Sequence, residues 1–120
     1  NPVKQEQYKR INRYHVEQFS YFLTKAKETV EGSGTLLDHG LYMFGSSISD
    51  GNAHAPFKVP TLLAGHAGGR IVTGRHVQAS NQTPLCDVFV SMLDCLNIHV
   101  DRFGDSKGRF DDLLFTDKSA

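Results

Sequence analysis

The chain has 120 residues, of which 39% are hydrophobic and 22% are charged, a balance typical of one soluble globular domain. Thirteen basic residues match thirteen acidic ones, so no net charge attracts nucleic acid, and we expect no nucleic-acid partner. No apolar run approaches the roughly 20 residues that a membrane-spanning helix needs. We therefore also expect no transmembrane segment.

The first part of the chain is predicted to form one long amphipathic helix between Lys4 and Glu31. Gly32 and Gly34 supply a stop, because glycine readily adopts the left-handed conformation that closes a helix. At about 1.5 Å per residue the helix would be roughly 42 Å long, more than the diameter of a small domain. We therefore expect it to lie on a larger protein body. Its apolar face recurs at spacings of three or four: Tyr8, Ile11, His15, Phe19, Phe22, Ala26 and Val30.

Two short apolar runs follow at residues 41–44 and 59–64, with a third candidate at residues 71–73. In the first two, polar residues do not alternate with apolar ones. Such unbroken apolar runs are typical of strands buried in a parallel sheet. Such sheets have several strands, so the predicted fold class is α/β, with a partial, mostly parallel sheet completed from elsewhere. Residues 1–120 would then be the C-terminal portion of one larger domain, and the partner would be the rest of that domain upstream of Asn1. A free-standing fold is the alternative.

A second helix is predicted from Pro84 to the region of Asn97, with Thr83 as its cap. Cys86 and Cys95 lie on it too far apart for a disulfide, and two cysteines are too few for a structural zinc site. We interpret both cysteines as packing residues. The buried stripe of this helix would consist of Leu85, Val88, Phe89, Met92 and Leu96.

The last segment, residues 101–120, is rich in glycine, aspartate and serine. We expect it to be a tail that docks loosely on the rest of the domain. Its possible anchors are Phe103, Phe110, Leu113, Leu114 and Phe115.

The loop at residues 45–54 is the most informative stretch for function. It leaves the end of a predicted strand, the edge at which ligands bind in open α/β sheets. Asp50 and His54 lie among small residues, and a carboxylate with an imidazole suits a divalent metal such as zinc, manganese or magnesium. On spacing alone a turn is commoner, in which Asp50 caps the backbone and His54 hydrogen-bonds a carbonyl. Gly51 and Asn52 would then adopt positive φ.

Further candidate residues surround this loop. His76 follows a glycine-rich turn and is a third possible metal ligand, although a loop histidine beside an arginine more often hydrogen-bonds at the surface. Asp38, His39 and Ser49 are candidates to orient metal-bound imidazoles, and for Asp38 and His39 a turn is the alternative. No Gly-x-Ser-x-Gly elbow is present, so no catalytic nucleophile is assigned.

The order of elements around the loop resembles the C-terminal half of the alkaline-phosphatase-like superfamily. In its sulfatases and cofactor-independent phosphoglycerate mutases, a Ser/Ala-Asp-His-Gly turn supplies metal ligands, and the mutases place another ligand histidine six residues before a Val-Pro strand. Asp50 matches the aspartate of the turn, and His54 stands six residues before Pro60. Gly51 occupies the place of the turn's histidine, so one ligand of a two-metal site is missing. The resemblance implies an alkaline-phosphatase-like fold.

A closer resemblance covers nearly the whole chain and points to a bacterial family of unknown function named for its HxxSHH motif. The naming motif would lie just before Asn1. Family members commonly carry a twin-arginine-type export signal, which implies an extracytoplasmic location, periplasmic or secreted, for the intact protein. The resemblance is carried by residues 10–19, 45–52, 62–65, 74–76, 92–94 and 100–106.

Two functions follow from these resemblances. The first is metal-dependent hydrolysis of an anionic phosphate or sulfate ester, with Asp50, His54 and His76 holding the metal. The second is a non-catalytic exported binding or assembly component that kept the fold and lost the metal site. The glycine at position 51 and the lack of a recognisable nucleophile point to the second function.

Overall fold

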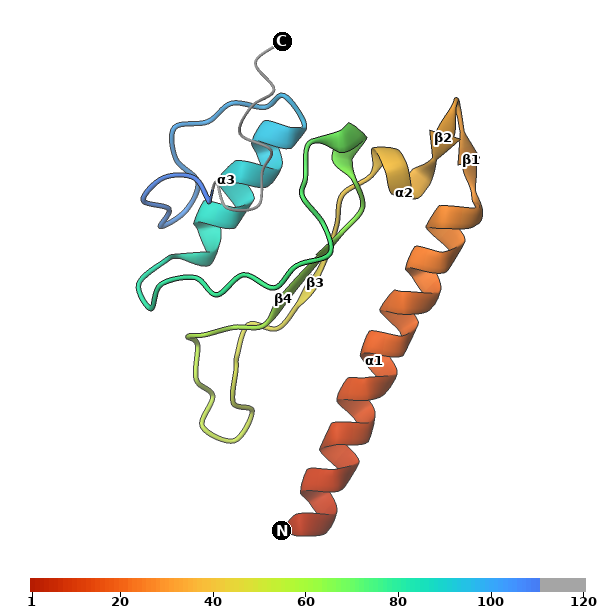
Figure 1. The fold of residues 1–120 in the computed structure, drawn as a ribbon. Helices are drawn as coiled ribbons and strands as arrows, with labels where there is room; N and C mark the ends of the chain where they lie inside the picture. The colour runs from red at the N-terminus through yellow and green to blue at the C-terminus, as the bar shows by residue number, and fades with distance from the viewer. Residues whose placement is uncertain (111–120) are drawn as a thin grey trace.

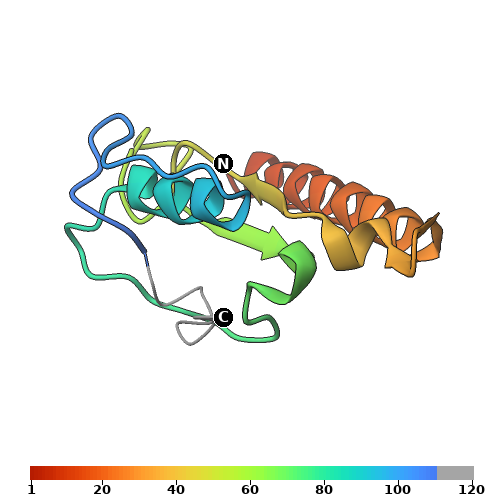
Figure 2. The ribbon, with the colours of Figure 1, turned by 90° about the horizontal axis from the view of Figure 1, so that it is seen from above.

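A computed structural model describes residues 1–110, which form an elongated molecule of 55 × 37 × 21 Å. The radius of gyration is 16.3 Å, against about 13 Å for a compact domain of this length. The short sheet formed by β3 (Tyr42–Gly45) and β4 (Thr61–Ala64) has α1 (Pro2–Glu28) on one side and α3 (Leu85–Cys95) on the other (Figure 1), as the view from above also shows (Figure 2). The elements are α1 (Pro2–Glu28), β1 (Val30–Glu31), β2 (Gly34–Thr35), α2 (Leu36–His39), β3 (Tyr42–Gly45), β4 (Thr61–Ala64), the 3-10 helix η1 (Ala67–Gly69) and α3 (Leu85–Cys95).

The long N-terminal helix is confirmed as α1, which begins at Pro2. The side chain of Asn1 caps it by accepting a hydrogen bond from the N–H of Val3 at 3.0 Å. The helix ends at Glu28 instead of Glu31, because Val30–Glu31 pairs in antiparallel fashion with Gly34–Thr35. Gly32, with φ +59°, makes the tight turn between these two strands.

The C-terminal half of α1 makes most of the contacts between this helix and the rest of the molecule. The rings of Phe19 and Phe44 stack with centroids 5.3 Å apart, and Phe22 meets Tyr42 edge to face at 5.1 Å. Ala26 is the helix's one buried residue. Large apolar side chains are nevertheless exposed along the helix: Val3, Tyr8, Ile11, Tyr14, Val16, Tyr21 and Phe22. The predicted apolar face therefore exists, but most of it is uncovered.

The prediction of a parallel sheet is wrong. β3 and β4 form an antiparallel hairpin with Tyr42 opposite Ala64 and Gly45 opposite Thr61, and β1 and β2 form a second antiparallel pair. Parallel neighbours need a crossover connection, usually a helix, whereas residues 46–60 form a loop that brings the chain straight back beside β3. Residues 71–73 form no strand. The alkaline-phosphatase-like α/β fold expected from the sequence is therefore not the fold of this chain.

Within the described residues, no third strand pairs with either edge of the β3–β4 hairpin. The N–H of Ser46 donates to the C=O of Pro60 at 3.2 Å, which extends the ladder past the strand ends. Hydrogen-bonded pairs alternate with non-bonded pairs in antiparallel sheets. The non-bonded class here contains the pairs Met43–Leu63 and Gly45–Thr61. The backbone N–H and C=O groups of these four residues consequently point outward from the sheet.

The second helix is confirmed as α3, but its buried face differs from the predicted stripe. Pro84 stands at the cap and no side chain caps the helix, because Thr83 pairs with the Ser80 hydroxyl instead. Leu96 is exposed, and the other residues of the predicted stripe are only half-buried. The buried residues are instead Asp87, Val90, Ser91, Asp94 and Cys95. A mostly polar face is thus turned inward.

Residues 101–110 explain this inversion, because they fold back onto the polar face of α3. The N–H of Phe110 donates to Ser91 Oγ at 2.7 Å and the N–H of Lys107 donates to Asp87 Oδ1 at 2.8 Å. Phe103 packs edge to face on Phe89. The other predicted tail anchors, Leu113, Leu114 and Phe115, lie outside the described residues.

Candidate functional site

Asp50, the first predicted metal ligand, closes a turn in the β3–β4 loop. Its Oδ1 accepts hydrogen bonds from the N–H groups of Asn52 at 2.8 Å and Ala53 at 3.0 Å. The loop closes on itself through the N–H of Ser49, which donates to the C=O of Ala55 at 2.9 Å. The two backbone donors and the nearby His54 hold the pKa of Asp50 below its ordinary value of 3.8. The carboxylate therefore organises its own loop.

Acid titration is expected to open this turn. A lowered folded pKa means that the ionised form stabilises the turn above pH 3.8 and that this contribution is lost as the pH falls through the folded value. The amide NMR signals of Asn52 and Ala53 should therefore shift at acid pH and lose protection against exchange. In the Asp50→Asn variant, whose side chain does not titrate, these shifts should be missing. Identical signals in both proteins from about pH 5 to about pH 2 would contradict the prediction.

The other two predicted ligands, His54 and His76, are both exposed. His54 has φ +50°, so it takes the left-handed position in the turn that the sequence assigned to Gly51 and Asn52. Within residues 1–110 the structure gathers no group of three histidine, cysteine or carboxylate side chains in metal-binding geometry. Asp50, His54 and His76 are thus not assembled into one centre, and a zinc, manganese or magnesium site stays a prediction.

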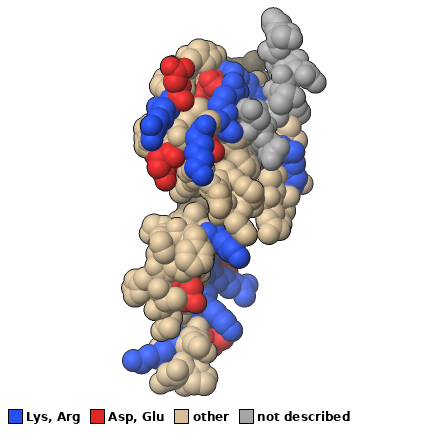
Figure 3. Space-filling view, turned by 90° about the vertical axis from the view of Figure 1, so that its left-hand side faces the viewer, with Lys and Arg blue, Asp and Glu red and all other residues tan. Residues whose placement is uncertain are grey.

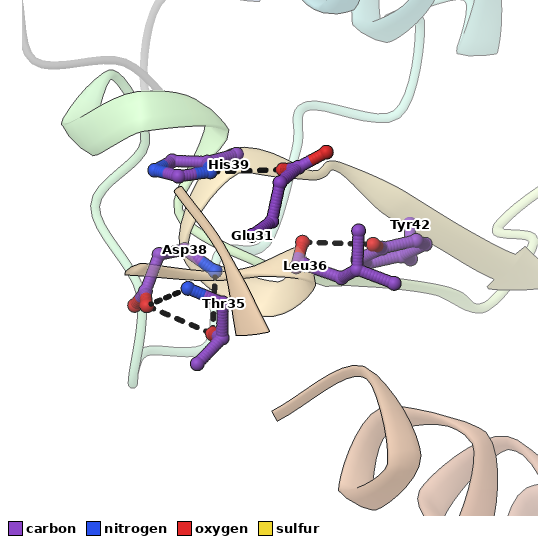
Figure 4. A network of polar contacts seen from close by, with 6 residues as sticks. All are labelled: Glu31, Thr35, Leu36, Asp38, His39 and Tyr42. Carbon is purple, nitrogen blue, oxygen red and sulfur yellow. Dashed lines mark hydrogen bonds and ion pairs between the residues drawn. The ribbon is translucent and has the colours of Figure 1, made fainter. Parts of the chain in front are cut away.

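Asp38 and His39 lie at the other end of β3, in a polar network (Figure 4). Asp38 Oδ2 accepts from both the N–H and the hydroxyl of Thr35 at 2.8 Å, which lowers the pKa of Asp38 and caps α2. His39 Nδ1 lies 2.9 Å from Glu31 Oε2. These side chains connect α2 to the β1–β2 hairpin. Of Asp38, His39 and Ser49, the three residues predicted to orient metal ligands, Ser49 alone lies in the same loop as Asp50.

Sequence reasoning missed the most buried charged cluster, which surrounds Asp94 on α3. Asp94 is 7% exposed, and its Oδ1 lies 2.6 Å from His99 Nδ1. Its Oδ2 lies 2.7 Å from the guanidinium of Arg109. The carboxylate thus joins the end of α3 to two points in the segment that follows. The one signal in the sequence is that Asp94 lies among apolar residues in a helix, where a carboxylate needs a partner.

The two cysteines are free thiols in packed surroundings. Burial raises the pKa of Cys95, and a hydrogen bond with Asp105 raises the pKa of Cys86. Both shifts favour the neutral thiol, the less reactive form. These environments suit the packing role expected from the sequence.

A small apolar groove lies between the start of β3 and α3, with a volume of about 260 Å³. Small-molecule sites usually have about 300–1,000 Å³, so this groove is on the scale of one or two side chains. It is lined by His39, Gly40, Leu41, Phe89, Met92, Leu93, Leu96 and Phe103. Three residues of the apolar stripe predicted to be buried on α3 therefore line one wall of the groove: Phe89, Met92 and Leu96.

No protein-family model, curated protein or solved structure matches this chain. In the part of the chain that the structure describes, no helix has the length and apolar character required to cross a membrane.

Proposed function

We propose that the chain is a binding and assembly unit that α1 attaches to a larger protein partner. The supporting observation is that α1, with 27 residues, has one buried residue while aromatic and aliphatic side chains are exposed between Val3 and Phe22. Fully burying one such side chain stabilises a complex by about 1.5–3 kcal/mol, so covering several of them is a strong driving force for docking. Exposed apolar side chains that extend along a helix in this way are typical of an interaction surface.

The composition of α1 favours a protein as the partner. Arg10 and Arg13 lie on the same helix as exposed tyrosines at positions 8, 14 and 21, and tyrosine and arginine are among the residue types most enriched where protein interfaces concentrate their binding energy. Under this proposal the partner is the rest of the domain to which the family resemblance assigns the chain, and the assembly is exported from the cytoplasm.

Photo-crosslinking tests the proposal. A benzophenone amino acid in place of Tyr14, introduced into the natural protein in its own cells, is expected to react with a peptide from outside residues 1–110, identified by mass spectrometry. The same group at Lys9, about 140° around the helix from Tyr14, should give little or no such product. Equal yields from both positions, or no product from either, would contradict a docking role for this face.

The competing proposal, metal-dependent ester hydrolysis, has a separate test. The purified natural protein would be measured for zinc and manganese and assayed with aryl phosphate and aryl sulfate esters. If the chain is a binding unit, neither Asp50→Ala nor His54→Ala should reduce the ester turnover. Metal-dependent cleavage that both substitutions abolish would replace the binding proposal with the hydrolase.

A further inference from the structure

The outer edge of β4, on the side away from β3, has the features of a strand that can pair again. Thr61 and Leu63 direct their N–H and C=O groups away from β3. Natural sheet edges are usually protected from pairing by a charged side chain or a proline. Residues 59–65 carry no charged side chain. Pro60 gives no protection either, because its C=O accepts from the N–H of Ser46, and its missing N–H therefore belongs to the inner side of the strand.

Leu62 leaves an apolar side chain uncovered beside this edge. It stands opposite Phe44, so both side chains lie on the same face of the hairpin. Phe44 is covered there by Phe19 of α1, with ring centroids 5.3 Å apart, whereas Leu62 is 46% exposed. The two views in Figure 1 and Figure 2 show the reason, since α1 lies on the β3 side of the hairpin in both. An open edge and an exposed apolar side chain thus occur together at β4.

We infer that β4 pairs in antiparallel fashion with β4 of a second copy of this chain, which joins the two hairpins into one continuous sheet. The two-fold register that keeps both outward-facing residues inside the paired strands places Thr61 opposite Leu63 of the second copy, as a hydrogen-bonded pair. Leu62 then stands opposite Leu62 of the second copy in a non-bonded pair, where Cβ atoms are about 4.5–5.5 Å apart. The hydrogen-bonding pattern and the uncovered leucine therefore require the same register.

The distribution of charge permits a second copy at this edge. A two-fold axis brings each side chain at its centre next to the same side chain of the other copy, so a charged residue there would repel itself. The centre of this edge is uncharged. Figure 3 shows charged side chains of both signs over the broad end of the molecule and more of them at its narrow end, with largely uncharged surface between the two.

The edge of β3 is less suited to a second copy. The same reasoning there pairs Met43 with Gly45 and places Phe44 opposite Phe44 of the second copy. Because Phe44 is stacked on Phe19, the two α1 helices would meet over the seam. With pairing at β4, each α1 stays beside an outer strand, and its exposed apolar side chains take no part in the seam. The inference thus goes beyond the proposed docking function and does not rest on it.

The dimer is expected to be weak and closed. β4 has four residues, and edge pairing over this length buries less than the about 1,200 Å² at which specific interfaces become stable. A two-fold pair uses the β4 edges of both copies, so association stops at the dimer. The expected behaviour is a monomer in dilute solution and a dimer in concentrated solution.

Sedimentation velocity of the full chain tests the inference. The sedimentation coefficient should rise from that of a monomer toward that of a dimer between about 10 µM and about 1 mM. Leu62→Lys should stay monomeric throughout this range, because it brings like charges together on the two-fold axis. Ile98→Lys is the matched control, since Ile98 is 49% exposed and lies outside the hairpin, and this variant should still dimerise. Ile11→Asp, a change on the exposed face of α1, should also still dimerise.

Cysteine crosslinking tests the register. Air oxidation of the Leu62→Cys variant should give a disulfide-linked dimer, because the two positions face each other across the axis. Thr61→Cys is the control, since the two copies of Thr61 are displaced by about 7 Å along the strand and about 4.8 Å across it, which is beyond disulfide reach. The unchanged chain, with Cys86 and Cys95, gives the background.

Each result either supports or overturns the inference. Circular dichroism would first confirm that every variant keeps its helix content. A monomer at every concentration, growth beyond the dimer, loss of the dimer in Ile11→Asp, or equal crosslinking of the two cysteine variants would overturn it. The docking function of α1 is tested separately by the Tyr14 crosslink, so the failure of one proposal is distinguishable from the failure of the other.

Discussion

Replacing Gly65 by alanine is expected to lower the free energy of unfolding by about 3 kcal/mol or more. Gly65 has φ +94°, a conformation that residues with side chains rarely adopt, and an added Cβ would lie 2.3 Å from the carbonyl oxygen of Gly40. That oxygen belongs to the backbone and accepts a hydrogen bond from the N–H of Ala67, so it has little freedom to move away. Urea denaturation followed by circular dichroism measures the loss.

Gly74→Ala is the matched control. Gly74 also has a positive φ, +75°, but an added Cβ there would meet no atom of residues 1–110 within 4 Å. Its substitution should cost only the backbone strain, about 1–2 kcal/mol. The difference between the two variants isolates the clash with Gly40. Equal losses for the two variants would show that the turn after β4 gives way and that the close approach to Gly40 has no structural importance.

Asp94→Ala is expected to cost about 2 kcal/mol and to release the segment after α3. Charge-assisted hydrogen bonds are worth about 1.5–3 kcal/mol each, and the exposure of His99 and Arg109 reduces the loss because water can solvate them. Asp94 itself is buried and holds both partners. Chemical denaturation measures the stability. Hydrogen exchange should be faster at Ser106, whose N–H donates to the C=O of Phe103, and at Phe110, whose N–H donates to Ser91 Oγ on α3.

Asp101→Ala serves as the control for Asp94, because Asp101 is an exposed carboxylate in the same segment. Its removal should change stability by no more than about 0.5 kcal/mol. An Asp94→Ala protein with the stability of the Asp101→Ala protein would mean that the buried cluster adds nothing to the attachment of residues 101–110.

Helix periodicity predicted α1 well because the signal is local. Apolar residues at spacings of three and four define a helix face wherever that face eventually packs, and Gly32 marks the turn beyond its end. Coverage is a different matter. The same spacing predicted burial that residues 1–110 do not supply, since the buried and half-buried positions of α1 are Phe19, Leu23 and Ala26.

Strand direction was not predictable from the apolar runs alone. A run such as residues 61–64 has the same composition in either orientation, and direction depends on the connection. The connecting loop at residues 46–60 has no helical periodicity. The absence of a crossover helix was the signal in the sequence for a hairpin. The unbroken apolar runs nevertheless led to the prediction of parallel strands.

The polar face of α3 shows why part of the site could not be read from the sequence. Hydrophobic periodicity assumes that buried means apolar, whereas Asp87 and Ser91 are buried because backbone N–H groups of Lys107 and Phe110 donate to them. Those partners lie about twenty positions away, and no local pattern links them. The turn around Asp50, by contrast, closes within five residues, which is why the sequence already offered it as an alternative to metal binding.

The backbone N–H and C=O groups of Met43, Gly45, Thr61 and Leu63 point outward. Another strand can therefore pair with the β3–β4 hairpin along either edge. Any extended polypeptide with matching donors and acceptors gains a full set of ladder bonds there, and another copy of the hairpin is the most abundant such polypeptide in a concentrated solution. The solubility of the purified chain therefore depends on the two edges of this hairpin. One proline or one lysine placed in an edge would block edge-to-edge pairing without disturbing the helices.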